Sequence, residues 1–213
     1  MPAEEFLKKI VEQLSIRCIV AGTDCSFGYQ RRGDYRMLQK YASEYHYEAQ
    51  IVDKMQYEGR DISSTFIREE IAAGNVEKAE LLLGYAYFVQ GTVVHGNQIG
   101  RTIGIPTINL LPPQEKLLPP FGVYAARVEI DGKRYNGITN IGCKPTIAGD
   151  NPVGVETNLF DFQGDLYGKH AKVSLLKWVR KEQKFQNVSE LKAQMEKDIA
   201  FCRSFLGDSA DSE

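Results

Sequence analysis

The first 84 residues place their hydrophobic side chains with the periods of helices and short buried strands. A helix is expected over residues 3–14, a strand at 17–22, a helix at 35–45 and a second strand at 47–53. This strand–helix–strand order predicts a parallel α/β arrangement, with fewer strands than an independent sheet of that class usually has. The apolar face of the first helix is formed by Phe6, Leu7, Ile10, Val11 and Leu14.

Two more helices are expected before the pattern changes. Ser63 and Ser64 can cap a helix that stops near Gly74. Asn75 can cap the next helix, which ends at Gly84. Ser and Asn side chains accept hydrogen bonds from the free N–H groups of a first turn, and glycine readily adopts the left-handed conformation that ends a helix.

Beyond Gly84 the hydrophobic period becomes that of a strand. Asp131–Gly132 separates two of the alternating segments and is typical of a two-residue hairpin. Strands joined by turns, with no helix between them, predict an antiparallel sheet or small barrel. The alternating segments are 87–95, 122–130, 133–141, 153–162 and 169–179.

One amphipathic helix follows the strands. Asn187 and Glu190 resemble a capping box at its start. We therefore expect an α+β chain with an α/β region at 1–84, an antiparallel β domain with a C-terminal helix at 85–207, and a disordered tail at 208–213. The apolar stripe of the helix comprises Leu191, Met195, Ile199, Cys202 and Leu206.

The composition excludes some classes of protein. The 213 residues are 43% hydrophobic and 25% charged with a net charge of -2, so no basic field recruits nucleic acid. No apolar run approaches the roughly 20 residues that span a bilayer, and the N-terminus does not read as a signal peptide. The four cysteines lack C-x-x-C or metal-ligand spacing, which favours free thiols in a reducing, cytoplasmic compartment. No obligate protein partner is evident.

Residues 91–109 hold the densest set of candidate chemical groups. Gly96, Gly100 and Gly104 allow the backbone to approach a ligand, and exposed N–H groups there can bind an anion. Arg101 adds a positive charge. No Gly-Lys-Ser/Thr follows, so this is not a Walker A loop. A flexible turn remains the alternative.

Thr107 and Asn109 lie two apart on an extended segment, so they point to the same side. Their hydroxyl and amide oxygens are hard, neutral ligands that can hold Mg²⁺ against the phosphates of ATP. A strand-forming threonine and a strand-ending asparagine are the alternative. Glu156, mid-strand on one face with Asn158, can act as a general base. Its alternative is a surface strand glutamate.

The run G-x-V-V-H-G-x-x-x-G-R-x-x-G-x-P-T-x-N at 91–109 resembles the start of riboflavin kinases. Further segments at 116–124, 140–146, 155–162, 165–168 and 180–185 resemble later family motifs, in order. The resemblance implies a six-stranded antiparallel barrel with a C-terminal helix. It also implies transfer of the γ-phosphate of ATP to riboflavin, giving ADP and FMN.

The resemblance implies roles as well. Thr107 and Asn109 would bind the Mg²⁺ of Mg-ATP, Gly96, Gly100, Arg101 and Gly104 would lie along the phosphates, and Glu156 would be the general base. Phe185, Trp178 and the weaker candidate Arg180 can border the flavin ring. Core packing is the alternative for Trp178.

The N-terminal part resembles the second half of a bacterial FMN adenylyltransferase domain, through G-x-D-x-x-F-G at 22–28, Gly33-Asp34 and I-S-S-T-x-x-R at 62–68. Such domains need an H-x-G-H motif, which stabilises the transition state. The histidines are only His46, His95 and His170, so the motif and its strand are absent. A truncated domain is expected, with a naturally short kinase-only form as the alternative.

Three functions remain in view. The first is a riboflavin kinase. The second is retained FAD synthetase (FMN adenylyltransferase) activity, which the missing histidine motif counts against. The third is a flavin- or nucleotide-binding module without turnover. A pure binder has no need of Thr107, Asn109 and Glu156 together, so their joint presence favours the kinase.

Overall fold

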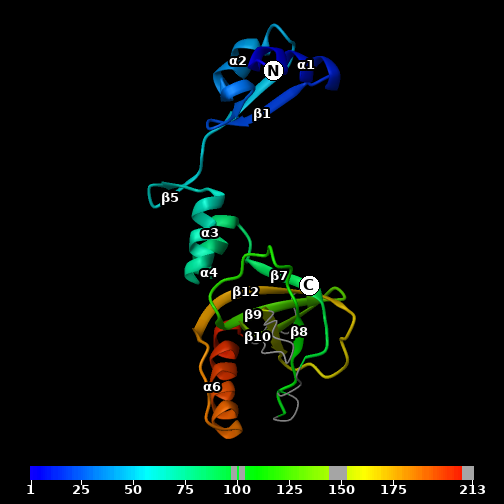
Figure 1. The fold of residues 1–213 in the computed structure, drawn as a ribbon, viewed down its shortest axis with the longest axis vertical. Coiled ribbons are helices and arrows are strands. Elements are labelled where there is room, and N and C mark those ends of the chain that lie inside the picture. The colour runs from blue at the N-terminus through cyan, green and yellow to red at the C-terminus, as the bar shows by residue number, and fades with distance from the viewer. Residues whose placement is uncertain (97–99, 101–103, 144–152, 208–213) are drawn as a thin grey trace. The chain divides into compact units, whose positions relative to one another are not determined.

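The structure is a computed structural model that describes residues 1–96, 100, 104–143 and 153–207 (Figure 1). Arg101 and the expected tail at 208–213 therefore lie outside the described residues. The chain divides into two compact units, Met1–Ser63 and Ser64–Glu213. The expected boundary at 84–85 differs from this division and stays a prediction.

The N-terminal unit packs two helices against two parallel strands. Helices α1 (Ala3–Leu14) and α2 (Tyr35–Ala42) accompany strands β1 (Cys18–Gly22) and β4 (Glu48–Val52), and the predicted parallel pairing is confirmed. The start of α2 is fixed by Asp34, whose carboxylate accepts a hydrogen bond from the Met37 N–H at 3.0 Å. Short elements complete the unit: β2 (Ser26–Phe27), η1 (Tyr29–Arg31), β3 (Gly33–Asp34), β5 (Gln56–Tyr57) and β6 (Arg60–Asp61).

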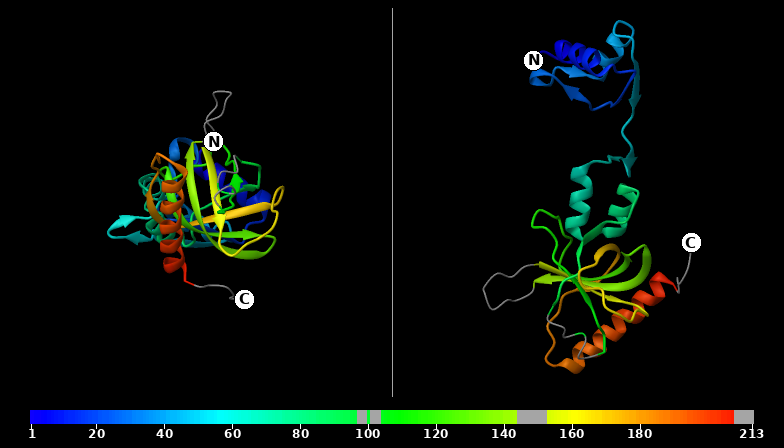
Figure 2. Two further views of the ribbon diagram at one scale, coloured as in Figure 1. Left: turned by 90° about the horizontal axis from the view of Figure 1, so that it is seen from below. Right: turned by 90° about the vertical axis from the view of Figure 1, so that its right-hand side faces the viewer.

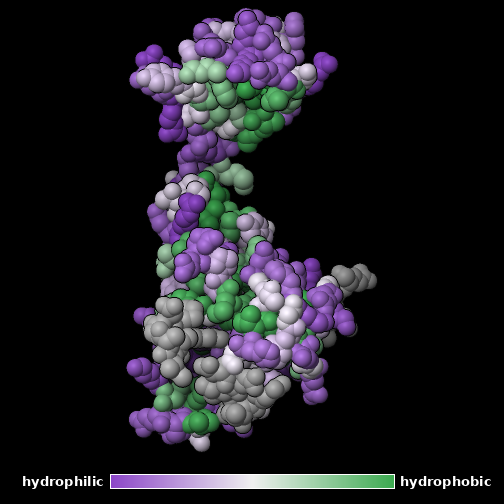
Figure 3. Space-filling model, turned by 45° about the vertical axis from the view of Figure 1, so that its right-hand side comes forward, coloured by the Kyte–Doolittle hydropathy of each residue, from purple (hydrophilic) through white to green (hydrophobic). Residues whose placement is uncertain are grey.

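One side of this unit is apolar and open to solvent. Leu7, Ala21 and Leu38 form its core, whereas Val20 and Val52 alternate to the opposite face of the strand pair and are exposed. Figure 3 shows apolar side chains gathered on one side of the unit. Parallel sheets are usually covered on both faces, so the two exposed valines are unusual.

Two helices open the C-terminal unit. Helices α3 (Ser64–Ala73) and α4 (Val76–Leu83) agree with the predicted spans. Gly84 ends α4 in the left-handed conformation, and its N–H donates to the Glu80 carbonyl at 2.8 Å. Asn75 occupies the predicted N-cap position of α4, but its side chain makes no cap bond and donates instead to the Glu70 carboxylate at 2.7 Å.

Six antiparallel strands form a nearly closed barrel in the order β7–β12–β9–β10–β11–β8, which confirms the predicted fold. A bridge between Val94 and Asn109 links the two edges. The three-residue β8 is too short to show an alternating pattern, so periodicity missed it. The strands are β7 (Phe88–Thr92), β8 (Ile108–Leu110), β9 (Gly122–Ile130), β10 (Lys133–Cys143), β11 (Val153–Leu159) and β12 (His170–Lys181).

Turn chemistry and alternation explain this register. Asp131 and Gly132 both have positive φ, at 52° and 75°, as the tight β9–β10 hairpin requires. Tyr124, Ala126 and Val128 point into the barrel and are fully buried. Helix α4 contributes to the same core, because Val76 is also fully buried there.

Helix α6 (Val188–Leu206) runs along the outer face of the barrel beside β9 and β10 (Figures 1 and 2). Asn187 caps it by accepting a hydrogen bond from the Glu190 N–H at 2.9 Å. Its apolar stripe covers Val123 and Ala125, so β9 is buried on both faces. Burial raises the pKa of the Cys202 thiol in this layer to about 12, which keeps it protonated.

All four cysteines are free thiols, as the sequence predicts. Among the described residues, no helix is long and apolar enough to cross a membrane.

Candidate active site

The outer face of the barrel carries one row of paired residues across five neighbouring strands. Glu156 on β11 lies between Asn109 on β8 and Asn140 on β10, and the row continues through Val123 on β9 to Arg180 on β12. Directly paired residues in an antiparallel sheet share a face. The strand register therefore brings together polar groups that are up to 71 positions apart along the chain.

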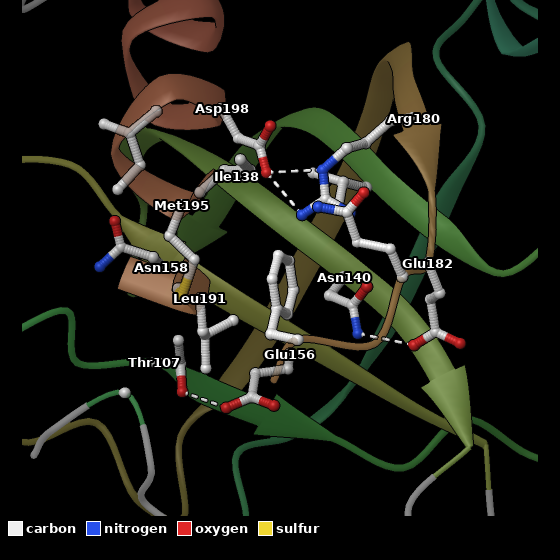
Figure 4. A pocket seen from close by; sticks show the side chains of 15 residues that line it. Thr107, Ile138, Asn140, Glu156, Asn158, Arg180, Glu182, Leu191, Met195 and Asp198 are labelled. Atoms are coloured by element: carbon white, nitrogen blue, oxygen red, sulfur yellow. Dashed lines mark hydrogen bonds and ion pairs between the residues drawn. The ribbon is translucent and has the colours of Figure 1, made fainter. Parts of the chain in front are cut away.

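Glu156 is held by Thr107, and Figure 4 shows the two side chains pointing toward one another. The Thr107 hydroxyl donates a hydrogen bond to the Glu156 carboxylate, with 2.6 Å between Oγ1 and Oε1. Thr107 precedes β8 by one residue, so its side chain shares the outer face with Asn109. The bond fixes one carboxylate oxygen and leaves the other available as a proton acceptor.

The glycines before β8 are needed for close packing. A Cβ at Gly96 would lie 2.5 Å from the Asn109 side-chain amide, and a Cβ at Gly100 would lie 2.3 Å from the Ile105 carbonyl oxygen. Real Cβ contacts are not so short, so only glycine fits both positions without a shift. Gly104 lies in a turn with φ of 79°. The backbone at Gly96 can therefore pack onto Asn109, which is almost fully buried.

A pocket lies over this row, between the sheet and α6 (Figure 4). Its volume is about 250 Å³, close to the lower end of the roughly 300–1,000 Å³ range of small-molecule sites. Thr107, Glu156 and Gly100 line one end. Apolar side chains from the sheet and α6 form part of its walls. The polar lining residues, besides Thr107 and Glu156, are Asn140, Asn158, Arg180, Glu182, Gln183 and Asp198.

A second pocket lies on the other side of Thr107. It is lined by Pro106, Thr107 and Ile108 from the start of β8 and by the segment after β11, including Phe162 and Tyr167. The rings of Tyr167 and His95 stack there with 3.7 Å between their centroids. Thr107 lines both pockets, so ligands held in the two pockets would meet at Thr107 and Glu156.

The structure places most of the candidate residues at this junction. Thr107, Glu156 and Gly100 line the first pocket, and Asn109 and Gly96 pack against each other beside it. Arg180 and Phe185 also line the first pocket, whereas Trp178 packs against the barrel core, with 5.2 Å between its ring centroid and that of Tyr124. The structure therefore supports core packing for Trp178.

Sequence reasoning missed several pocket residues. The Asn140 amide donates a hydrogen bond to Glu182 at 3.1 Å, and the Asn158 amide donates to the Pro106 carbonyl at 2.7 Å. The position of Asn158, two residues from Glu156 on the same strand, is a signal that could have found it. Asn140 and Glu182 lie in the 140–146 and 180–185 segments that resemble family motifs, whereas Asp198 gave no signal, because only the tertiary structure brings α6 to the pocket.

The donor atoms beside the junction fit a magnesium ion carried by ATP. The Thr107 hydroxyl and the Asn109 amide could supply hard oxygen ligands, and the Glu156 carboxylate lies beside them. Mg²⁺ usually takes only one or two protein ligands and completes its shell with phosphate oxygens and water. Within the described residues, no group of three or more His, Cys, Asp or Glu side chains could hold a metal by itself.

The comparison with known families decides what this site belongs to. A family model for riboflavin kinase matches residues 83–206, more than half of the chain. The chain belongs to the riboflavin kinase family. A second model, for FAD synthetase, matches residues 1–66.

Similar proteins are named for two activities, riboflavin kinase and FMN adenylyltransferase. A bifunctional riboflavin kinase/FMN adenylyltransferase from Escherichia coli strain K12 is 39% identical over 97% of this chain and 66% of the relative. The protein of the same name from Bacillus subtilis is 38% identical over 92% of this chain and 62% of the relative. The chain thus spans a little under two thirds of their length.

A solved structure is similar to both units. It is described as a macrolide-efflux protein from Streptococcus pneumoniae, and it matches with a TM-score of 0.85 and 36% identity. The match covers 95% of this chain and 65% of the solved one.

Proposed function

We propose that this chain is a riboflavin kinase, which transfers the γ-phosphate of ATP to the 5′-hydroxyl of riboflavin and releases ADP and FMN. The observation that carries the proposal is the Thr107–Glu156 hydrogen bond at the junction of two pockets, in a chain of the riboflavin kinase family. A phosphoryl transfer between two substrates needs two binding sites that meet beside a group that can accept a proton. The two pockets and Glu156 fit this requirement.

The first pocket suits riboflavin. Its apolar walls from the sheet and α6 can take a planar ring system, and the ribityl chain can extend toward Glu156. Phe185 and Arg180 line the same pocket, and Phe185 remains a proposed flavin contact. The second pocket, with its stacked His95 and Tyr167, suits the nucleotide. The phosphates would then reach the glycine loop and Thr107.

The chemistry of the step follows from these positions. The riboflavin hydroxyl oxygen forms a bond to the γ-phosphorus, the bond to the β,γ-bridging oxygen breaks, and Glu156 accepts the hydroxyl proton. Thr107 holds the carboxylate in place, and Thr107 and Asn109 offer oxygens to the magnesium of Mg-ATP. The metal supplies charge neutralisation on the phosphates, and most of the remaining catalysis comes from positioning.

The test is an incubation of the whole chain with riboflavin, ATP and Mg²⁺, with the flavins separated by chromatography over time. FMN alone is the expected product, and no FMN should form in a parallel incubation that contains EDTA. Riboflavin binding without any product would contradict the kinase and favour a binding module.

Retained FMN adenylyltransferase activity is a second candidate, favoured by the FAD synthetase match over residues 1–66. The same time course tests it, because FAD would follow FMN. We expect no FAD, since the sequence has no H-x-G-H motif to stabilise the adenylyl-transfer transition state.

A further inference from the structure

The apolar walls of the first pocket belong to different elements. Val123 and Ile138 come from the sheet, whereas Leu191 and Met195 come from α6. Leu191 and Met195 are four residues apart and therefore lie on one face of the helix. The distance between the two walls is consequently set by how α6 docks on the barrel.

A buried ion pair docks α6 beside these walls. On β12, Arg180 donates from Nε and Nη2 to one Asp198 oxygen, Oδ2, at 2.8 and 2.7 Å. Gln194 donates to the other oxygen, Oδ1, at 2.8 Å. The side chains of Arg180 and Asp198 are only 20% and 5% exposed. Because the pair is shielded from solvent, loss of either partner would leave a buried charge and displace the helix.

The rest of the Arg180 guanidinium is also engaged by the protein. Nη1 donates to the Lys181 carbonyl at 3.0 Å, and the guanidinium carbon lies 5.9 Å from the centroid of the Phe185 ring. Arg180 therefore connects the end of β12, the following loop and α6. Figure 4 shows its charged end directed at Asp198.

We propose that Arg180, Asp198 and Gln194 form a positioning unit that fixes the distance between the sheet wall and the α6 wall of the first pocket, and so the width available to a planar aromatic ring. Arg180 acts through Asp198 rather than by contact with the ring. The inference rests on the proposed function, in which that ring is the flavin. It adds that affinity for riboflavin depends on an ion pair that need not touch it.

A double-mutant cycle tests this unit. Equilibrium binding of riboflavin, without ATP, is measured by flavin fluorescence for the whole chain, Arg180→Ala, Asp198→Ala and the double variant. Each single variant is expected to weaken riboflavin binding about ten-fold. The double variant should bind riboflavin no more weakly than the single variant with the lower affinity, because both substitutions remove the same interaction. Multiplying losses in the double variant would overturn the proposal, since Arg180 would then contact the ring itself.

The same helix offers a matched control. Arg203 on α6 donates to both carboxylate oxygens of Asp161, at 2.8 Å each, and neither residue lines the pocket. Asp161→Ala should therefore leave riboflavin affinity within about two-fold of the unmodified chain. An equal loss of affinity in Asp161→Ala would overturn the proposal, because any weakening of α6 docking would then suffice.

Two further readouts keep the test decisive. If the alanine variants do not fold, Arg180→Lys and Asp198→Asn replace them in the same cycle, with the same expected non-additivity. Failure of the unmodified chain to bind riboflavin would count against the proposed function. Normal binding by the unmodified chain with unchanged affinity in all the variants would count against the positioning unit alone.

Discussion

At the scale of single residues, the site depends on contacts that leave little freedom. Thr107 holds one oxygen of Glu156 at 2.6 Å, and Gly96 lets the loop backbone pack onto Asn109. Misplacing a catalytic group by about 1 Å can cost about a hundred-fold in rate. Conservative substitutions at these positions should therefore have large effects on the kinetics, and the effects on turnover and on KM should be separable.

Glu156→Gln should lower turnover about 1,000-fold with little change in riboflavin affinity, because the amide keeps the shape of the side chain but cannot accept the proton. Turnover is measured as FMN formed per minute, and affinity by flavin fluorescence. Glu129→Gln is the control, since Glu129 pairs with Arg134 and Lys172 on the barrel surface. Near-normal turnover in Glu156→Gln would remove it from the mechanism.

Gly96→Ala should raise the KM for Mg-ATP about ten-fold or more, because the added methyl group must displace the Asn109 amide. Initial rates over a matrix of ATP and Mg²⁺ concentrations measure the effect. Gly91→Ala is the matched control, since the nearest atom to its added methyl group would lie at 3.9 Å. If the two alanine variants give the same KM, the loop does not act through Asn109.

At the scale of elements, α6 connects folding to function. It covers the outer face of β9 and supplies one wall of the first pocket. Its first turn is ordered by Asn187 and Glu190, the pair that the sequence identified. Asn187 itself does not line the pocket, so its substitution can change stability without removing a pocket-lining side chain.

Asn187→Ala should lower the free energy of unfolding by about 1 kcal/mol, because the first turn loses its cap. Urea titration followed by the fluorescence of Trp178 measures it, since this is the only tryptophan of the chain and lies in the barrel core. Ser189→Ala, exposed in the same turn, is the control and should not lower stability. Equal losses in the two variants would contradict the capping role.

At the scale of the whole molecule, the two units have separate cores, and α3 and α4 belong to the second. Val76 on α4 is fully buried in the barrel core, and a Cβ at Gly74 would lie 2.9 Å from the Trp178 ring. The two family models fit this arrangement only approximately, because one ends at residue 66 and the other begins at 83.

A chain that starts at Ser64 should therefore show the same Trp178 unfolding transition as the full chain. A chain that starts at Tyr85 should be less stable by at least about 2 kcal/mol, since the barrel loses the buried Val76 and the cover over Trp178. Urea titrations of the two shortened chains measure the difference. Equal stability would instead support the boundary at residues 84–85.

The sequence by itself determined the features that depend on neighbouring residues. Alternation located five of the six barrel strands, Asp131–Gly132 located their hairpin, and the 91–109 motif indicated the family. These signals are local, because side-chain direction, turn conformation and helix capping depend on residues a few positions apart. One local prediction differed from the structure: the Asn75 side chain bonds Glu70 and makes no hydrogen bond to the first turn of α4.

Only the tertiary structure decided which distant residues meet. The strand order places Glu156 between Asn109 and Asn140, and the docking of α6 brings Asp198 to Arg180. Neither could be derived from periodicity, because strand order and helix docking are set by burial summed over the whole core. The sequence therefore pointed to the candidate groups, and the packing of the barrel and its helix determined the pocket in which they lie.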